Sequence, residues 1–221
     1  MTSPESARLR ARPAPPSAAP LPPGDHRLGI GRERDVVLVV PESYDAARPA
    51  PLVVGLHGAG GNAARRIERL RPHAERIGAL LLAPDSVGAT WDVIRGGLGP
   101  DVRRIGAGLA FAFARFAVDP ARIAIEGFSD GASYALTLGL PNGDLFRRIF
   151  AFSPGFMAPP ELVGAPSVFV SHGTHDPVLP VACSRRIVPQ LRRLGLSVDY
   201  REFDGEHVAP DELVRAAFDS L

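Results

Sequence analysis

The stretch that decides the fold is residues 125–133, IEGFSDGAS, in which Ser129 stands between two glycines with one residue on either side. An apolar segment leads into this G-x-S-x-G pattern and small residues follow it, so we expect a strand, a sharp turn and a helix. In such a turn the serine backbone is strained, and the residues two positions before and after it approach too closely for side chains. Gly127 and Gly131 therefore predict that Ser129 is presented above a strand end as a nucleophile. The plain alternative is a strand–helix turn in which the serine only caps the helix.

Strands and helices are expected to alternate along the rest of the chain. Apolar, β-branched segments predict strands at residues 35–41, 51–58, 79–85, 122–129, 148–154, 167–173 and 197–203. Helical spacing of apolar residues predicts helices at about residues 62–78, 101–116, 130–140, 181–194 and 210–220. Asn62 and Asp101 are positioned as N-caps. This order predicts a single α/β domain, with a mostly parallel sheet, helices on both faces and no large lid.

The composition narrows the classes of function. The 221 residues contain 25 Lys and Arg against 24 Asp and Glu, and the arginine pairs are scattered, so no nucleic-acid partner is expected. Cys183 is the only cysteine, which excludes an internal disulfide. No apolar run reaches the ~18–20 residues of a membrane span, so we expect no stable membrane insertion. No Cys or carboxylate cluster indicates a metal site, and no cofactor is expected.

The first 28 residues differ in composition from the rest. Seven of the first 23 residues are proline, which excludes a helix, so we expect residues 1–28 to form a flexible, proline-rich arm and residues 29–221 to form the catalytic domain. No apolar segment follows the early arginines, so a signal peptide is not expected either. These features predict a cytoplasmic protein. The sequence leaves the oligomeric state and the role of the arm open.

A nucleophilic serine needs a histidine base, and the histidine needs an acid to orient it. Asp176 follows the predicted strand at 167–173, and His207 follows the last predicted strand. The chain order serine, acid, histidine is the one expected of this turn in an open α/β sheet. The sequence therefore predicts a Ser129–His207–Asp176 triad. Asp204 or Glu202 is the alternative orienting acid.

Other histidines have less demanding interpretations. His175 lies too early in the chain to be the base, and we expect it to anchor a loop or line a pocket. His172 precedes a glycine at a strand end and is expected to be a satisfied structural residue. The loop HGAGGN at 57–62 has the glycine content that lets backbone N–H groups face a ligand. We expect the oxyanion donors to be the N–H groups of Ala59 and Asp130, with the His57 side chain anchoring the loop.

Several motifs together resemble a known family. They are G-x-S-x-G, LHGAGG at 56–61, HGTHDPVLP at 172–180 and the late G-x-H at 205–207. The chain resembles the α/β-hydrolase superfamily and is most similar to its phospholipase/carboxylesterase group, which includes acyl-protein thioesterase-like enzymes. It also looks like the small esterases related to polyhydroxybutyrate depolymerases. The resemblance runs from about residue 35 to the C-terminus, and it implies the same triad and Ala59 as an oxyanion donor.

These patterns predict a serine esterase that cleaves small-molecule carboxylic esters, of small to medium acyl or alcohol groups, through an acyl-enzyme. A peptidase, a thioesterase or a lysophospholipase on the same fold is the alternative within enzymes, and a non-catalytic binding protein is the alternative outside them. Aromatic and sulfur-containing side chains at strand ends are candidates for the substrate pocket, with core packing as the alternative for each. They are Trp91, Phe128, Phe156 and Met157. Members of the families that the chain resembles often carry a neutral residue after the nucleophile, whereas this chain has Asp130, so we expect a preference for neutral over anionic acyl groups.

Overall fold

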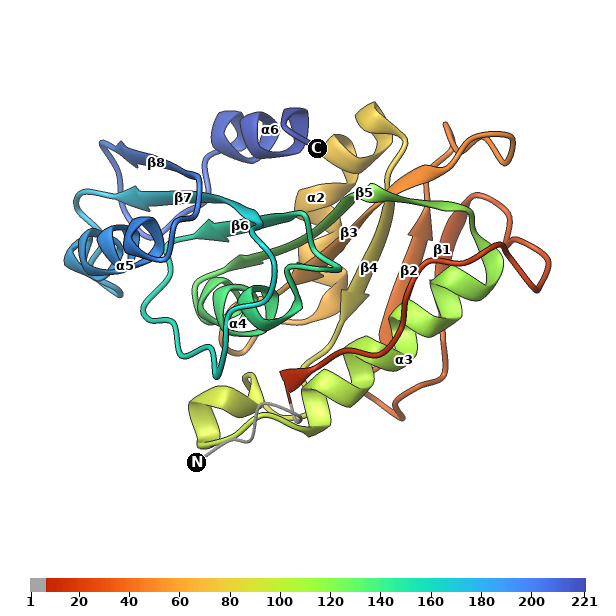
Figure 1. The fold of residues 1–221 in the computed structure, drawn as a ribbon, viewed down its shortest axis with the longest axis horizontal. Helices are drawn as coiled ribbons and strands as arrows, with labels where there is room; N and C mark the ends of the chain where they lie inside the picture. The colour runs from red at the N-terminus through yellow and green to blue at the C-terminus, as the bar shows by residue number, and fades with distance from the viewer. Residues whose placement is uncertain (1–6) are drawn as a thin grey trace.

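The computed structural model describes residues 7–221, in which one eight-stranded sheet has the strand order β1-β2-β4-β3-β5-β6-β7-β8 (Figure 1). The strands are β1 (Gly24–Arg27), β2 (Val36–Val40), β3 (Ala50–Leu56), β4 (Leu80–Pro84), β5 (Val118–Phe128), β6 (Arg148–Phe152), β7 (Ser167–Gly173) and β8 (Val198–Phe203). The helices are α2 (Ala63–Ile77), α3 (Pro100–Arg115), α4 (Asp130–Gly139), α5 (Ala182–Arg193) and α6 (Asp211–Asp219), with short 3-10 turns η1 (Asp92–Arg95) and η2 (Leu140–Asn142). The expected single-domain α/β fold is confirmed.

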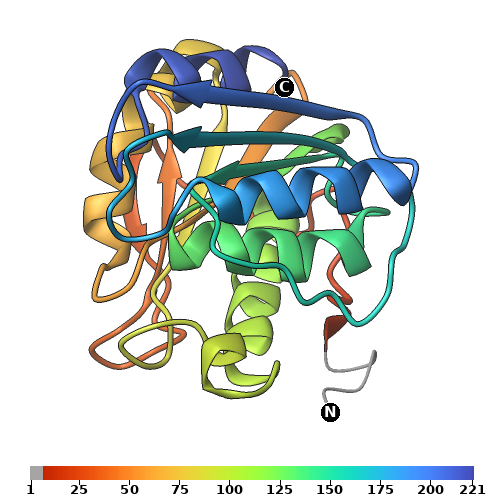
Figure 2. The ribbon, with the colours of Figure 1, turned by 90° about the vertical axis from the view of Figure 1, so that its left-hand side faces the viewer.

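Helices cover both faces of the sheet, and each face has its own apolar core. Figures 1 and 2 show α3, α4 and α5 on one face, with α2 and α6 on the other. The larger core joins α3, α4 and α5 to the sheet. In the second core, Ile67 and Leu70 of α2 pack with Val214 and Phe218 of α6. The connections at residues 85–99 and 153–166 hold no more than the turn η1, so the described chain has no large lid.

The sheet is parallel from β4 to β8, and this brings the functional strand ends together. Leu56 at the end of β3 is level with Gly127 near the end of β5, and Phe128 is level with Phe152 of β6. β3 and β4 are buried along their whole length, as expected of continuous apolar runs in the middle of a parallel sheet. Because parallel strands end at the same edge, the loops after β3, β5, β7 and β8 meet there.

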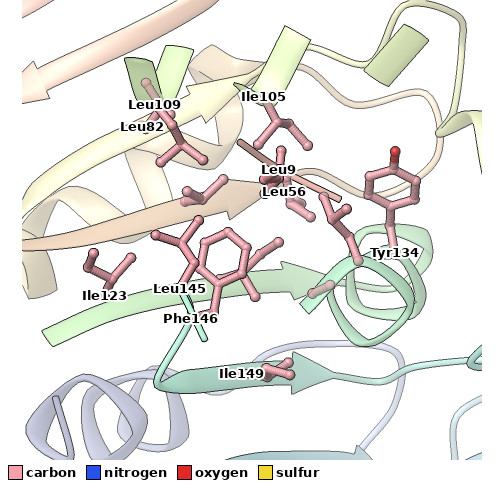
Figure 3. Close-up of a cluster of buried hydrophobic side chains, with 14 of the residues drawn as sticks. Leu9, Leu56, Leu82, Ile105, Leu109, Ile123, Tyr134, Leu145, Phe146 and Ile149 are labelled. Carbon is pink, nitrogen blue, oxygen red and sulfur yellow. The ribbon is translucent and has the colours of Figure 1, made fainter. Parts of the chain in front are cut away.

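The expectation of a flexible N-terminal arm is wrong for residues 7–28; residues 1–6 lie outside the described part of the chain. Leu9 inserts into the core among Leu56, Ile105 and Phe146 (Figure 3), and it is only 3% exposed. The Leu9 N–H donates to the Asn142 side chain, whose amide donates in turn to the Ala7 carbonyl. Proline excludes helix but not close packing of an extended segment, because apolar side chains can still be buried.

The arm is also held by charge and by strand pairing. Arg8 and Arg12 both form ion pairs with Asp144, at 3.0 and 2.7 Å. Further along, β1 pairs antiparallel with β2, so the sheet begins before the expected domain boundary at residue 28. The described part of the arm therefore belongs to the folded domain.

The two expected helix caps have different outcomes. Asn62 caps α2 through a hydrogen bond of 2.9 Å from the Arg65 N–H. Asp101 does not cap α3, which begins one residue earlier. The Asp101 carboxylate is buried and accepts hydrogen bonds from the N–H groups of Val87 and Asp92 instead. It thereby holds the loop between β4 and α3 close to the strand ends. None of the helices within residues 7–221 is both long and apolar enough to cross a bilayer.

Candidate active site

Ser129 stands in the sharp turn between β5 and α4. Its backbone has φ 57° and ψ −120°, a left-handed conformation that costs energy for a residue with a side chain. A Cβ on Gly127 would lie 2.1 Å from the Gly131 carbonyl oxygen, and a Cβ on Gly131 would lie 2.5 Å from the Leu56 oxygen of β3. Gly127 is thus required by its close approach to the Gly131 backbone, as expected, whereas Gly131 is required by the backbone of the neighbouring strand β3.

Three side chains form a continuous hydrogen-bonded chain above the sheet. The Ser129 hydroxyl lies 2.9 Å from His207 Nε2, and His207 Nδ1 lies 2.6 Å from an oxygen of Asp176. These residues come from the loops after β5, β8 and β7, respectively. This is the arrangement in which an imidazole takes a proton from a serine while a carboxylate holds its tautomer.

Asp176 is fixed more firmly than this single contact would achieve. Its other oxygen accepts hydrogen bonds of 2.8 Å from the N–H groups of Val178 and Leu179. Burial acts to raise the pKa of Asp176, but hydrogen bonds from His207 and from these two N–H groups bring that pKa below its usual value. The carboxylate is therefore ionised throughout the neutral range, as a partner of an imidazolium should be.

The competing acids are engaged elsewhere. Asp204 pairs with His175 at 3.0 Å, and both side chains are exposed. Glu202 of the edge strand β8 forms a two-pronged ion pair with Arg185 of α5. Neither acid contacts His207 in the described structure, so Asp176 alone occupies the orienting position.

His172 is buried and satisfied, as expected. Its Nε2 donates to the Leu179 carbonyl at 2.7 Å, and its Nδ1 accepts from the Ser184 hydroxyl at the same distance. His172 therefore supports the loop that carries Asp176.

The loop after β3 lies against the serine. A Cβ on Gly58 would be 3.3 Å from the Ser129 Cβ, so this loop passes directly beside Ser129. His57 anchors it, as expected: Nδ1 donates to the Gly58 carbonyl at 2.7 Å, and Nε2 accepts from the Ser86 N–H at 3.0 Å. Burial lowers the pKa of His57, which favours the neutral ring that these two bonds require. Within the described chain, the N–H groups of Ala59 and Asp130 have no hydrogen-bond acceptor and are available to a ligand.

A second loop, residues 86–91 after β4, contacts both the loop after β3 and the first turn of α4. The sequence patterns did not indicate these contacts. The Ala89 carbonyl accepts from Gly60 N–H at 2.9 Å, and Trp91 Nε1 donates to the His57 carbonyl at 2.8 Å. On the other side, Thr90 donates to the Asp130 carboxylate at 2.7 Å. No motif marks these contacts, because each depends on loops that are distant in sequence.

The four expected pocket residues lie in different surroundings. Trp91 is fully buried, with its ring stacked 4.9 Å from Tyr134, so its expected role in substrate contact is wrong. Its indole fills the core and positions the loop instead. Phe128 is half-buried and packs 4.7 Å from the His207 ring. Phe156 and Met157 are half-buried in the connection after β6.

A cavity of about 330 Å³ opens beside the His207 ring. It is lined by Arg66, Arg69, Phe128, His207, Val208 and Ala209. The Arg66 guanidinium is buried and forms an ion pair with the fully buried Glu126 of β5. Neither the cavity nor this pair was expected, since helical spacing identifies the apolar face of α2 but not a buried arginine. Within residues 7–221, no three metal-ligating side chains gather at one place.

Comparison with known proteins agrees with the fold and the motif. The family model for phospholipase/carboxylesterase matches residues 105–221, just over half of the chain. A probable feruloyl esterase C of Aspergillus oryzae is 30% identical over 165 residues, covering 71% of this chain and 59% of that protein. Feruloyl esterase C of Emericella nidulans is 30% identical over 156 residues, covering 67% and 57%. The chain thus spans less than two thirds of the length of these relatives.

A solved structure shows the same fold. The crystal structure of esterase PE8 superposes with a TM-score of 0.68 at 24% identity, covering 83% of this chain and 95% of that one. The resemblance inferred from the sequence motifs is therefore confirmed at the level of the fold and the family.

Proposed function

Because the chain belongs to the phospholipase/carboxylesterase family, we propose that it hydrolyses carboxylic esters through Ser129, His207 and Asp176. The observation that carries this proposal is the unbroken hydrogen-bonded chain from the serine hydroxyl through the imidazole to the carboxylate. The reaction is acyl transfer to water in two steps. No cofactor is needed for this chemistry.

In the first step, Ser129 Oγ attacks the ester carbonyl while His207 Nε2 takes its proton. Asp176 holds the Nδ1–H tautomer and stabilises the imidazolium. The N–H groups of Ala59 and Asp130 receive the oxyanion, each contributing about 3–4 kcal/mol in the transition state. His207 then protonates the leaving alcohol oxygen, and a water molecule repeats the sequence on the acyl-enzyme.

For the acyl group we propose a hydroxycinnamoyl type of ester as the first candidate. The support is the similarity to two proteins named feruloyl esterase or probable feruloyl esterase. Phe156 and Met157 offer partly exposed apolar surface after β6, next to α4, on which an aromatic acyl group can pack. Aliphatic p-nitrophenyl esters from acetate to laurate are the comparison set.

The test is hydrolysis of that series and of methyl ferulate by the wild type and by Ser129→Ala. The matched control is Ser197→Ala, an exposed serine at the opposite end of the sheet. We expect Ser129→Ala to lose at least 10³-fold in kcat, whereas the control keeps wild-type rates. Equal rates for wild type and Ser129→Ala on every ester would overturn the proposal and leave a binding protein as the better interpretation.

The cytoplasmic location stays a prediction from the sequence. Fractionation of cells that produce the protein, followed by immunodetection, would test it.

A further inference from the structure

The cavity beside His207 has a definite place relative to the proposed reaction. Its walls come from the first two turns of α2, from Phe128 at the end of β5 and from residues 207–209. The imidazole of His207 forms one wall, and the Phe128 ring packs on that imidazole at 4.7 Å. The cavity therefore adjoins the group that handles the proton.

This position selects one half of an ester. In the proposed reaction, which this inference presupposes, the imidazole protonates the leaving oxygen, so that oxygen lies within hydrogen-bond reach of Nε2. The atoms bonded to the leaving oxygen then extend along the imidazole. The acyl group is held instead through its carbonyl carbon, which is bonded to Ser129, and through its carbonyl oxygen, which the oxyanion donors bind. The cavity therefore lies on the alcohol side of the ester.

The charges on the two sides of Ser129 are opposite. On the cavity side, the Arg66 charge is balanced by Glu126, but Arg69 has no carboxylate partner in the described structure. One Arg69 nitrogen donates to the Ala209 carbonyl at 2.9 Å, which holds its guanidinium against the cavity wall. On the oxyanion side, the Asp130 carboxylate is hydrogen-bonded to Thr90. A negatively charged group is thus favoured beside His207 and disfavoured beside Asp130.

We propose that this cavity is the alcohol-binding subsite and that it takes a flat or aromatic alcohol carrying an anionic group, such as a carboxylate. The Phe128 ring and Val208 supply the apolar walls, and Arg69 is the specificity-determining residue that binds the anion. The same charge on the acyl half of the ester gains nothing from Arg69.

Two pairs of esters test the direction of this preference. In the first pair, 4-acetoxybenzoate carries the charge on the alcohol half, and 4-acetoxybenzamide is its neutral counterpart. In the second pair, monomethyl terephthalate carries the charge on the acyl half, with methyl 4-carbamoylbenzoate as the neutral counterpart. The measured quantity is the ratio of kcat/KM for the charged ester to that for the neutral one, so that differences in intrinsic reactivity cancel between protein variants.

Arg69→Gln is expected to lower the first ratio about fivefold, the size of one exposed ion pair, and to leave the second ratio unchanged. Arg69→Lys keeps the charge and should retain most of the preference. Arg103→Gln is the matched control, because this exposed arginine on α3 also has no ion pair in the described structure. A first ratio that is the same in wild type and Arg69→Gln would overturn the inference while leaving the proposed hydrolysis intact.

A binding measurement keeps the inference testable if none of these esters is cleaved. Calorimetric titration with 4-hydroxybenzoate and 4-hydroxybenzamide, the two released alcohols, requires no turnover. We expect the anion to bind more tightly than the amide to wild type and to Arg103→Gln, and the difference to vanish in Arg69→Gln. Equal affinity of wild type for the two alcohols would contradict the subsite. Absence of turnover on any ester would count against the proposed function alone.

Discussion

The Thr90 hydroxyl donates a hydrogen bond of 2.7 Å to the carboxylate of Asp130, the residue that directly follows Ser129. This contact joins the loop after β4 to the first turn of α4. It fixes a negative charge beside the backbone N–H that we propose as an oxyanion donor. The charge opposes further negative charge on the acyl half of a substrate.

Asp130→Asn should therefore raise the activity on anionic acyl groups relative to neutral ones by about two- to fivefold. The amide oxygen of asparagine still accepts from Thr90, so the loop contact is kept. The measurement compares kcat/KM for the p-nitrophenyl monoester of succinate with that for p-nitrophenyl butyrate. Asp119→Asn, a half-buried aspartate at the start of β5, is the control. An unchanged ratio in Asp130→Asn would show that this carboxylate does not influence acyl selection.

Asp176→Asn should lower kcat by about 10³-fold or more and leave KM within a few-fold of wild type. Asparagine can present its N–H to His207 and so favours the wrong imidazole tautomer, and it removes the charge that stabilises the imidazolium. The control is Asp204→Asn, since Asp204 contacts only the exposed His175. If Asp204→Asn were the slower enzyme, the orienting acid would have been assigned incorrectly.

Trp91→Phe should reduce stability rather than substrate binding. The substitution leaves a gap against Tyr134 and deprives the buried His57 carbonyl of its donor, together costing about 2–3 kcal/mol in the free energy of unfolding. Urea unfolding followed by far-UV circular dichroism measures this loss. Tryptophan fluorescence is not usable, because Trp91 is the only tryptophan and the substitution removes it. Wild-type stability together with a raised KM would instead support substrate contact by this residue.

Asp144→Asn should destabilise the protein at neutral pH but not in strong acid. Burial acts to raise the pKa of Asp144, but hydrogen bonds from Arg8 and Arg12 lower it to about 2, below its usual value of 3.8. The stabilisation from this group is therefore present above pH 4 and is lost as the pH falls toward 2. Because all three side chains are partly exposed, the expected loss at pH 7 is only about 1 kcal/mol.

Urea unfolding of wild type and Asp144→Asn at pH 7, 4 and 2.5 checks this prediction, with Asp45→Asn as the control for a local exposed pair. The difference between wild type and Asp144→Asn should shrink between pH 4 and 2.5. A difference that grew as the pH fell would have the wrong sign for the Arg8–Asp144–Arg12 cluster.

The parts of the fold that could be predicted are those with a local pattern. The turn at Ser129 is defined by two glycines, and the loops after β7 and β8 are recognised by their order in the chain. The positions of Asp176 and His207 follow from that order, and the structure brings both within hydrogen-bond distance of their partners.

The parts that could not be predicted depend on contacts between distant segments. β1 has the sequence GDHR, which lacks strand propensity, and it forms because β2 offers a free edge. The position of Trp91 after a strand predicts a pocket residue, but the loop turns its ring inward between His57 and Tyr134. The packing of Leu9 could not be predicted either, because it depends on contacts with residues far along the chain.

The hydrogen bond between Leu9 and Asn142 has a consequence for the order in which the protein can fold on the ribosome. These two residues are 133 positions apart, and the acceptor Asn142 lies in η2, just after α4. Leu9 therefore lacks this hydrogen-bond acceptor until α4 and η2 have been synthesised. A proline-rich segment suits this delay, because it stays extended without pairing with neighbouring residues until Asn142 has been synthesised.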